Sequence, residues 1–106
     1  MKIKRKIQVF SLIVQRVAES RFPEIARVCF PVATCIQLVL HPDVKAEKVD
    51  GILWPYFHRL AEEFAEPGRT YHFELWQSGD KISTMTYNEL HPMAIEHRES
   101  LVKILS

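Results

Sequence analysis

The sequence predicts one α+β domain over residues 1–106, in which a small antiparallel sheet packs against helices. Two observations predict this class. Apolar residues recur at helical spacing in several segments, whereas residues 71–87 alternate in polarity around a short glycine loop. With 106 residues, of which 47% are apolar and 25% charged, the chain has the composition of a globular domain with a single hydrophobic core.

The first predicted element is a helix over residues 3–19, because its apolar residues recur three or four positions apart. Its β-branched content leaves a strand as the alternative. Phe22 ends this element, since a residue before proline avoids the α region. Pro23 is then expected to open a short second helix that reaches Val28.

Residues 32–40 are expected to form a buried strand, because this apolar run lies between Pro31 and Pro42. Cys29 and Cys35 are six positions apart and form no CxxC pair, so no zinc site is expected. Their apolar neighbours predict two reduced, largely buried thiols, with a disulfide between them as the alternative.

Residues 44–65 show the strongest helical periodicity of the chain. Pro55 lies inside this pattern, so it either kinks one helix or begins a second helix after Gly51. Residues 92–105 are also predicted to be helical, with a wide apolar arc that includes Leu101.

A β-hairpin is predicted over residues 71–87, because aromatic and β-branched residues stand on both sides of Ser78-Gly79-Asp80. Side chains alternate between the two faces of a strand. One face of the first arm is therefore expected to carry Tyr71, Phe73 and Leu75, and the other His72, Glu74 and Trp76.

The net charge of +1 conceals an asymmetry, because residues 1–27 carry seven bases and two acids, whereas residues 43–106 carry seven bases and eleven acids. A mixed solvated surface is the simplest interpretation. The basic end and the acidic remainder could also attract each other, within the fold or between two copies of the chain. The basic segment could instead bind nucleic acid, although no nucleic-acid motif accompanies it.

Motifs for known chemistry are missing from the sequence. It contains no GxGxxG or Walker loop, no GxSxG and no HExxH, so no cofactor and no metal are expected. The apolar run over residues 28–40 is too short to span a bilayer, and the basic N-terminus lacks a small-x-small cleavage site. A cytoplasmic protein without a membrane anchor is the resulting expectation.

Three weak candidates for catalysis remain, and the first two are His58 and Glu62. They follow Trp54 at i+4 and i+8, so the carboxylate could polarise the histidine on one edge of a helix. His72 is the third candidate, since it shares a strand face with Glu74. A solvated helix flank and an ordinary strand face are the structural interpretations of the same residues.

We expect a small non-enzymatic binding or accessory protein that forms a homodimer through apolar surface, with a further protein partner possible. Residues 81–87 carry one charge and no proline, so as an edge strand they would need cover. The expected interface residues are Trp54, Trp76, His97 and Leu101. The first alternative is a small-ligand pocket or modest enzyme lined by Trp54, His58, Glu62, His72 and Trp76. The second alternative is nucleic-acid binding through the basic N-terminal segment.

Overall fold

The computed structural model describes the backbone of residues 2–90 and 93–97. Two helices and five strands follow one another in this part of the chain. In order they are α1 (Lys2–Arg21), β1 (Ile25–Val32), β2 (Cys35–Leu40), α2 (Ala46–Phe64), β3 (Tyr71–Gln77), β4 (Asp80–Tyr87) and β5 (Ala94–His97).

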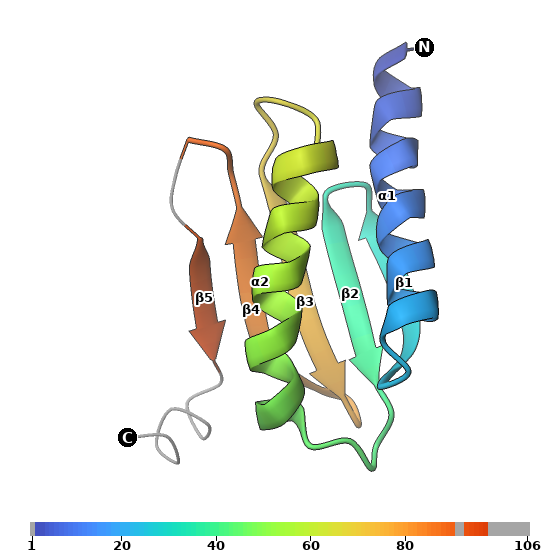
Figure 1. The fold of residues 1–106 in the computed structure, drawn as a ribbon, viewed down its shortest axis with the longest axis vertical. Coiled ribbons are helices and arrows are strands. Elements are labelled where there is room, and N and C mark those ends of the chain that lie inside the picture. The colour runs from blue at the N-terminus through green and yellow to red at the C-terminus, as the bar shows by residue number, and fades with distance from the viewer. Residues whose placement is uncertain (1, 91–92, 98–106) are drawn as a thin grey trace.

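The strands form one sheet in the order β1-β2-β3-β4-β5 (Figure 1). Neighbouring strands are antiparallel except β2 and β3, which run parallel because α2 connects them and returns the chain to the same end of the sheet. The predicted α+β class is therefore confirmed, with a sheet that is mostly rather than wholly antiparallel.

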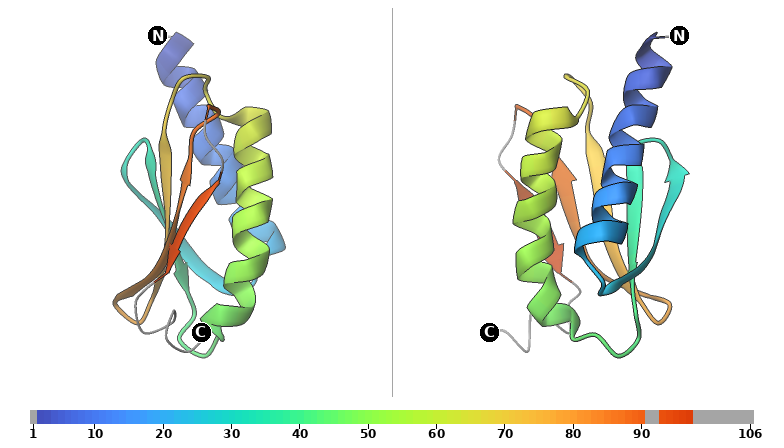
Figure 2. Two further views of the ribbon diagram at one scale, coloured as in Figure 1. Left: turned by 90° about the vertical axis from the view of Figure 1, so that its left-hand side faces the viewer. Right: turned by 45° about the vertical axis from the view of Figure 1, so that its right-hand side comes forward.

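Both helices lie on the same side of the sheet (Figure 2). α1 packs on the β1 side and α2 crosses the strands nearer β4 (Figure 1). We call the helix-covered side the inner face of the sheet and the opposite side the outer face. No described element covers the outer face.

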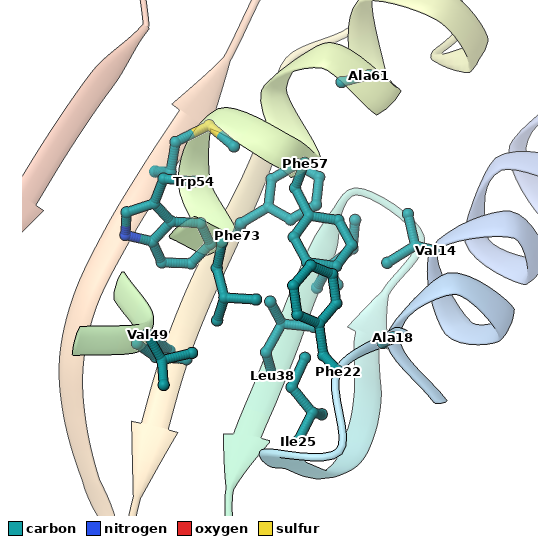
Figure 3. Packing of buried hydrophobic residues seen from close by; sticks show 14 of the residues in the cluster. Val14, Ala18, Phe22, Ile25, Leu38, Val49, Trp54, Phe57, Ala61 and Phe73 are labelled. Carbon is teal, nitrogen blue, oxygen red and sulfur yellow. The ribbon is translucent and has the colours of Figure 1, made fainter. Parts of the chain in front are cut away.

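The core lies between the helices and the inner face (Figure 3). Phe57 of α2 packs on Phe73 of β3 with ring centroids 5.8 Å apart, and Trp54 lies at the edge of the same ring at 6.4 Å. Val14 and Ala18 of α1 are fully buried against this cluster. Such close contacts between aromatic rings contribute stability beyond the area that they bury.

Two consecutive buried hydrogen bonds connect α2 to β4. The indole Nε1 of Trp54 donates to Ser83 Oγ at 3.0 Å, and Ser83 Oγ donates to Asp50 Oδ1 at 2.5 Å. Ser83 is 2% exposed and Asp50 8% exposed. Because buried polar groups must be hydrogen-bonded to avoid a desolvation penalty, these two hydrogen bonds fix the position of the helix on the sheet.

The N-terminal helix is confirmed, but the short second helix is not. Residues 25–32 form β1 instead, with Ile25 buried and Val28 and Phe30 half-buried on the inner face. A helix of so few residues forms too few hydrogen bonds to offset the unfavourable free energy of nucleating its first turn. A strand of the same residues gains hydrogen bonds to β2 as well as this burial.

The strand predicted over residues 32–40 is shorter than expected. Val32 ends β1 and pairs with Cys35, the first residue of β2, so the apolar run contains the turn of a hairpin. Uniform apolar composition hides such a turn, because the run has no glycine, asparagine or aspartate to mark it.

α2 is one helix that passes through both expected breakpoints, Gly51 and Pro55. A proline inside a helix costs about 3 kcal/mol. Trp54 and Phe57, on either side of it, are fully buried. Each buried side chain of this size contributes about 1.5–3 kcal/mol, so the burial of these two residues together offsets the cost of Pro55 inside the helix.

The hairpin over residues 71–87 is confirmed as β3 and β4. Ser78 and Gly79 form its turn with φ of 52° and 83°. Two successive positive φ values give the turn a twist that matches antiparallel strands, and glycine adopts such a conformation without steric cost.

The last predicted helix is wrong where the structure describes it. Residues 94–97 form β5, which pairs with β4 in antiparallel register. β4 therefore is not an edge strand, contrary to expectation; β1 and β5 are the two edges of the described sheet. The free backbone groups of β4 favour a strand here over helical propensity. The rest of the predicted helix, including Leu101, lies outside the described residues.

Candidate functional site

The outer face of the sheet is the candidate site, because it presents functional side chains on a surface that no described element covers. Strand pairing places three rows of side chains across it. The first row is Cys35, His72, Thr86 and Ala94. The second is Cys29, Gln37, Glu74, Thr84 and Glu96. The third is Arg27, Val39, Trp76 and Lys81.

Glu74 is the centre of the hydrogen-bonding network on this face. Its Oε1 accepts from Gln37 Nε2 at 3.0 Å and from Trp76 Nε1 at 2.9 Å. Its Oε2 lies 3.9 Å from Lys81 Nζ. The carboxylate therefore fixes side chains from three adjacent strands and sets the indole of Trp76 in place.

The surroundings of Glu74 stabilise its charge. Partial burial by itself raises the pKa of this carboxyl, but the hydrogen bonds from Trp76 and Gln37 and the charge of Lys81 outweigh burial and lower the pKa below its ordinary value. Burial and the nearby Glu74 carboxylate raise the pKa of the Cys35 thiol. Cys35 is therefore held as a thiol, which is the less nucleophilic form.

A shallow hollow of about 170 Å³ opens beside Trp76. The half-buried side chains of Cys29 and Val39 contribute apolar surface, and the exposed Arg27 contributes a guanidinium group. Its full lining is Arg27, Cys29, Gln37, Val39, Trp76 and Gly79. An indole, a guanidinium and small apolar groups are the combination found at the centre of protein interfaces.

A larger hollow of about 420 Å³ lies along the solvent-facing side of α2. Its described lining comes from that helix alone and contains no histidine or cysteine: Ile52, Pro55, Tyr56, Arg59, Leu60 and Glu63. We place the candidate site on the outer face instead, because the hydrogen-bonded and titratable side chains gather there.

The residues expected to line a single pocket are divided between the two layers. Trp54 is completely buried in the core, so it is available neither to a ligand nor to a partner. His58 and Glu62 form the expected pair on α2, with Nδ1 and Oε1 3.4 Å apart, and the His58 ring packs on Tyr87 of β4.

His72 and Trp76 lie on the other side of the sheet from His58. His72 is exposed on the outer face, where its Nδ1 lies 3.4 Å from Thr86 Oγ1. The backbone of His97 pairs with Ser83 in β5, and Leu101 lies outside the described residues. The five residues predicted to line one pocket therefore lie in different places: Trp54 in the core, His58 and Glu62 on α2, and His72 and Trp76 on the outer face.

Gln37, Arg27 and the two cysteines were not predicted at the site. Cys29 and Cys35 are free and half-buried on the outer face rather than largely buried. The signal that could have found Cys35 and Gln37 is the alternation within β2, where Cys35, Gln37 and Val39 interleave with Ile36, Leu38 and Leu40. That alternation is typical of a strand with one open face.

Two further classes of site are missing from the part of the chain that the structure describes. No three histidine, cysteine, aspartate or glutamate side chains there are grouped to hold a metal ion. None of its helices has the length and apolar character needed to cross a membrane.

Comparison of the chain with protein-family models, with curated proteins and with solved structures found no match.

Proposed function

We propose that the protein is a non-enzymatic binding protein that forms a homodimer through the outer face of its sheet. The observation that carries this proposal is the five-stranded sheet with both described helices on one side, while its other face, which no described element covers, holds Trp76 beside a hollow. Tryptophan and arginine are the residues that most often dominate binding energy at interfaces.

The distribution of polarity on the outer face supports an interface rather than a simply solvated sheet. Its middle strands carry the half-buried Cys35, Val39 and Trp76 beside the hydrogen-bonded Glu74 and the exposed Lys81, and the exposed charges Arg27 and Glu96 lie on its edge strands. Such a mixture of partly buried apolar groups and paired polar groups is typical of the more polar, non-obligate protein interfaces.

The mixture of charges favours a second copy over a polyanion. Arg27 and Lys81 face outward together with Glu74 and Glu96, so the described outer face has no net excess of either sign among these groups. Nucleic acid would require an excess of bases. A surface with both signs can be complementary to itself, which a two-fold dimer requires.

The size of the face predicts a weak dimer. Five strands about 4.8 Å apart, each with about six residues rising about 3.3 Å, give a face of roughly 20 by 20 Å. This area is at the low end for specific complexes, where association is transient. We therefore expect a dissociation constant of about 1–100 μM.

Sedimentation equilibrium over a concentration series from about 1 to about 200 μM tests the proposal. The unmodified chain should pass from monomer to dimer, and Trp76→Asp should remain monomeric because it places a charge at the centre of the interface. Ile52→Asp is the matched control, since Ile52 is 63% exposed on the helical layer. A monomer at every concentration, or a dimer that survives Trp76→Asp, contradicts the proposal.

A further inference from the structure

We infer that the two copies pack about a two-fold axis that runs along β2 in the plane between their outer faces, so that Trp76 of each copy covers the hollow of the partner subunit. This inference rests on the proposed dimer and names the arrangement of its subunits. It follows from the positions of the apolar and charged side chains among the five strands.

The larger apolar side chains of the outer face lie on one half of the sheet. Strands β1, β2 and β3 carry Cys29, Val32, Cys35, Val39 and Trp76. On the same face, the described parts of β4 and β5 carry Lys81, Thr84, Thr86, Ala94 and Glu96. Val32 is 60% exposed, so the apolar half reaches the edge strand β1. The contact that removes the most apolar surface from water is therefore centred on β2, the middle of the first three strands.

The charged side chains select the same strand. Two outer faces meet symmetrically only about an axis that lies in the plane between them, and a residue on that axis faces its own copy. A charged residue on the axis would repel that copy. β3 carries Glu74 and β4 carries Lys81, whereas the outer-face residues of β2 are uncharged: Cys35, Gln37 and Val39. β2 therefore lies on the axis without bringing like charges together.

The register then fixes what lies on either side of the axis. Rotation about a line along β2 keeps every row at its height along the strands and exchanges β1 with β3. Arg27 and Trp76 lie in one row on either side of Val39, so Arg27 of one copy faces Trp76 of the partner subunit. The neighbouring row of the partner subunit holds its Glu74. A guanidinium group on an indole ring is a favourable cation–π contact, and the nearby carboxylate adds complementary charge.

The hollow lies where this arrangement places the partner's indole. Four of its six lining residues belong to β1 and β2: Arg27, Cys29, Gln37 and Val39. Because β3 of the partner subunit lies over β1, its indole covers the hollow and removes Cys29 and Val39 from water. Each indole Nε1 already donates to Glu74 of its own chain at 2.9 Å, so little side-chain freedom is lost when the ring is buried.

Opposite charges introduced at Val39 test the axis by sedimentation equilibrium. Val39→Glu and Val39→Lys each place a charge opposite its own copy, so each variant alone should weaken the dimer about tenfold or more. An equimolar mixture of the two variants pairs the opposite charges across the axis. The mixture should therefore return the dissociation constant to within about threefold of the unmodified chain.

Thr84→Glu and Thr84→Lys are the matched controls, because Thr84 lies on the same face but on β4, beyond β1 of the partner subunit. Alone and mixed, they should leave the dissociation constant within about threefold of the unmodified value. Cys35→Glu and Cys35→Lys repeat the test at a second position of β2. Circular dichroism shows whether each variant is folded, and the Cys35 pair replaces the Val39 pair if a Val39 variant is not.

The outcomes separate the inference from the proposed function. A dimer that dissociates with Trp76→Asp but tolerates both Val39 variants overturns the placement of the axis and leaves the proposed interface intact. Folded Val39 variants that dissociate without recovery in the mixture also overturn the axis. A monomeric unmodified chain overturns both the proposed function and the inference.

Discussion

The inner and outer faces of the sheet are built from the same strands, yet they are held together by different physical interactions. On β2, Ile36, Leu38 and Leu40 are buried under the helices. The alternate residues Cys35 and Gln37 remain half-exposed on the outer face. The inner face is stabilised by packing of apolar side chains, whereas the outer face is organised by hydrogen bonds to one carboxylate.

The two tryptophans show what this difference means for function. Trp54 is 0% exposed, and its Nε1 donates to Ser83 within the core. Trp76 is half-buried, and its Nε1 donates to Glu74 on the outer face. The same residue type thus has a structural role on one face and is available for recognition on the other, which composition alone does not distinguish.

The largest expected difference between the faces is in the free energy of unfolding of the tryptophan variants. Trp54→Ala should lower it by about 3–5 kcal/mol, because it removes a large core side chain and leaves a cavity. Trp76→Ala should lower the free energy of unfolding by less than about 1.5 kcal/mol, because it removes little more than the net contribution of one hydrogen bond.

Urea unfolding followed by circular dichroism measures both variants at one low protein concentration. Trp54→Phe keeps a ring in the core and gives a smaller, still measurable loss if Trp54→Ala does not fold. Equal losses for Trp54→Ala and Trp76→Ala would show that the two faces are not energetically distinct.

An intermediate effect is expected from the adjacent residues Ser83 and Thr84 of β4. Ser83→Ala should lower the free energy of unfolding by about 1–3 kcal/mol, because the buried indole of Trp54 loses its acceptor and Asp50 loses a donor. Thr84→Ala, on the outer face, should change it by no more than about 0.5 kcal/mol. The same unfolding measurement checks this pair, and a larger loss from Thr84→Ala would reverse the assignment of the faces.

The smallest expected effect is a pH dependence that comes from Glu74. Because its pKa is lowered in the folded chain, its contribution to stability is present above the ordinary carboxyl pKa and is lost as the pH falls towards the lowered value. Glu74→Gln should therefore flatten the acid side of the stability curve, measured by urea unfolding at a series of pH values.

Glu63→Gln is the matched control for this experiment, since Glu63 is exposed on α2. It should leave the acid dependence of the unmodified chain in place. If Glu74→Gln and the unmodified chain lose stability in parallel as the pH falls, the outer-face network does not stabilise the charge of Glu74.

Local patterns sufficed for the elements whose signal lies within one segment. The helical spacing over residues 3–19 and 44–65 and the alternation around Gly79 predicted α1, α2 and the β3–β4 hairpin. These segments carry periodic apolar residues and a glycine turn, and both act over a few neighbouring positions. The division of His72, Glu74 and Trp76 from Tyr71, Phe73 and Leu75 followed from the same alternation.

Only the tertiary structure decided β1, β5 and the outer face. β1 and β5 form because β2 and β4 offer backbone hydrogen bonds to segments with little helical stability of their own. Gln37 and Glu74 meet although they are 37 residues apart in the chain. Trp54 points from α2 into the core, whereas His72 is exposed on the outer face of β3, so the two do not share a site. The sequence by itself determined in which segments apolar residues recur at helical or strand spacing, and which side chains share a strand face. Which face is covered depends on where the helices pack, and that is settled by the joint burial of residues distant in the chain.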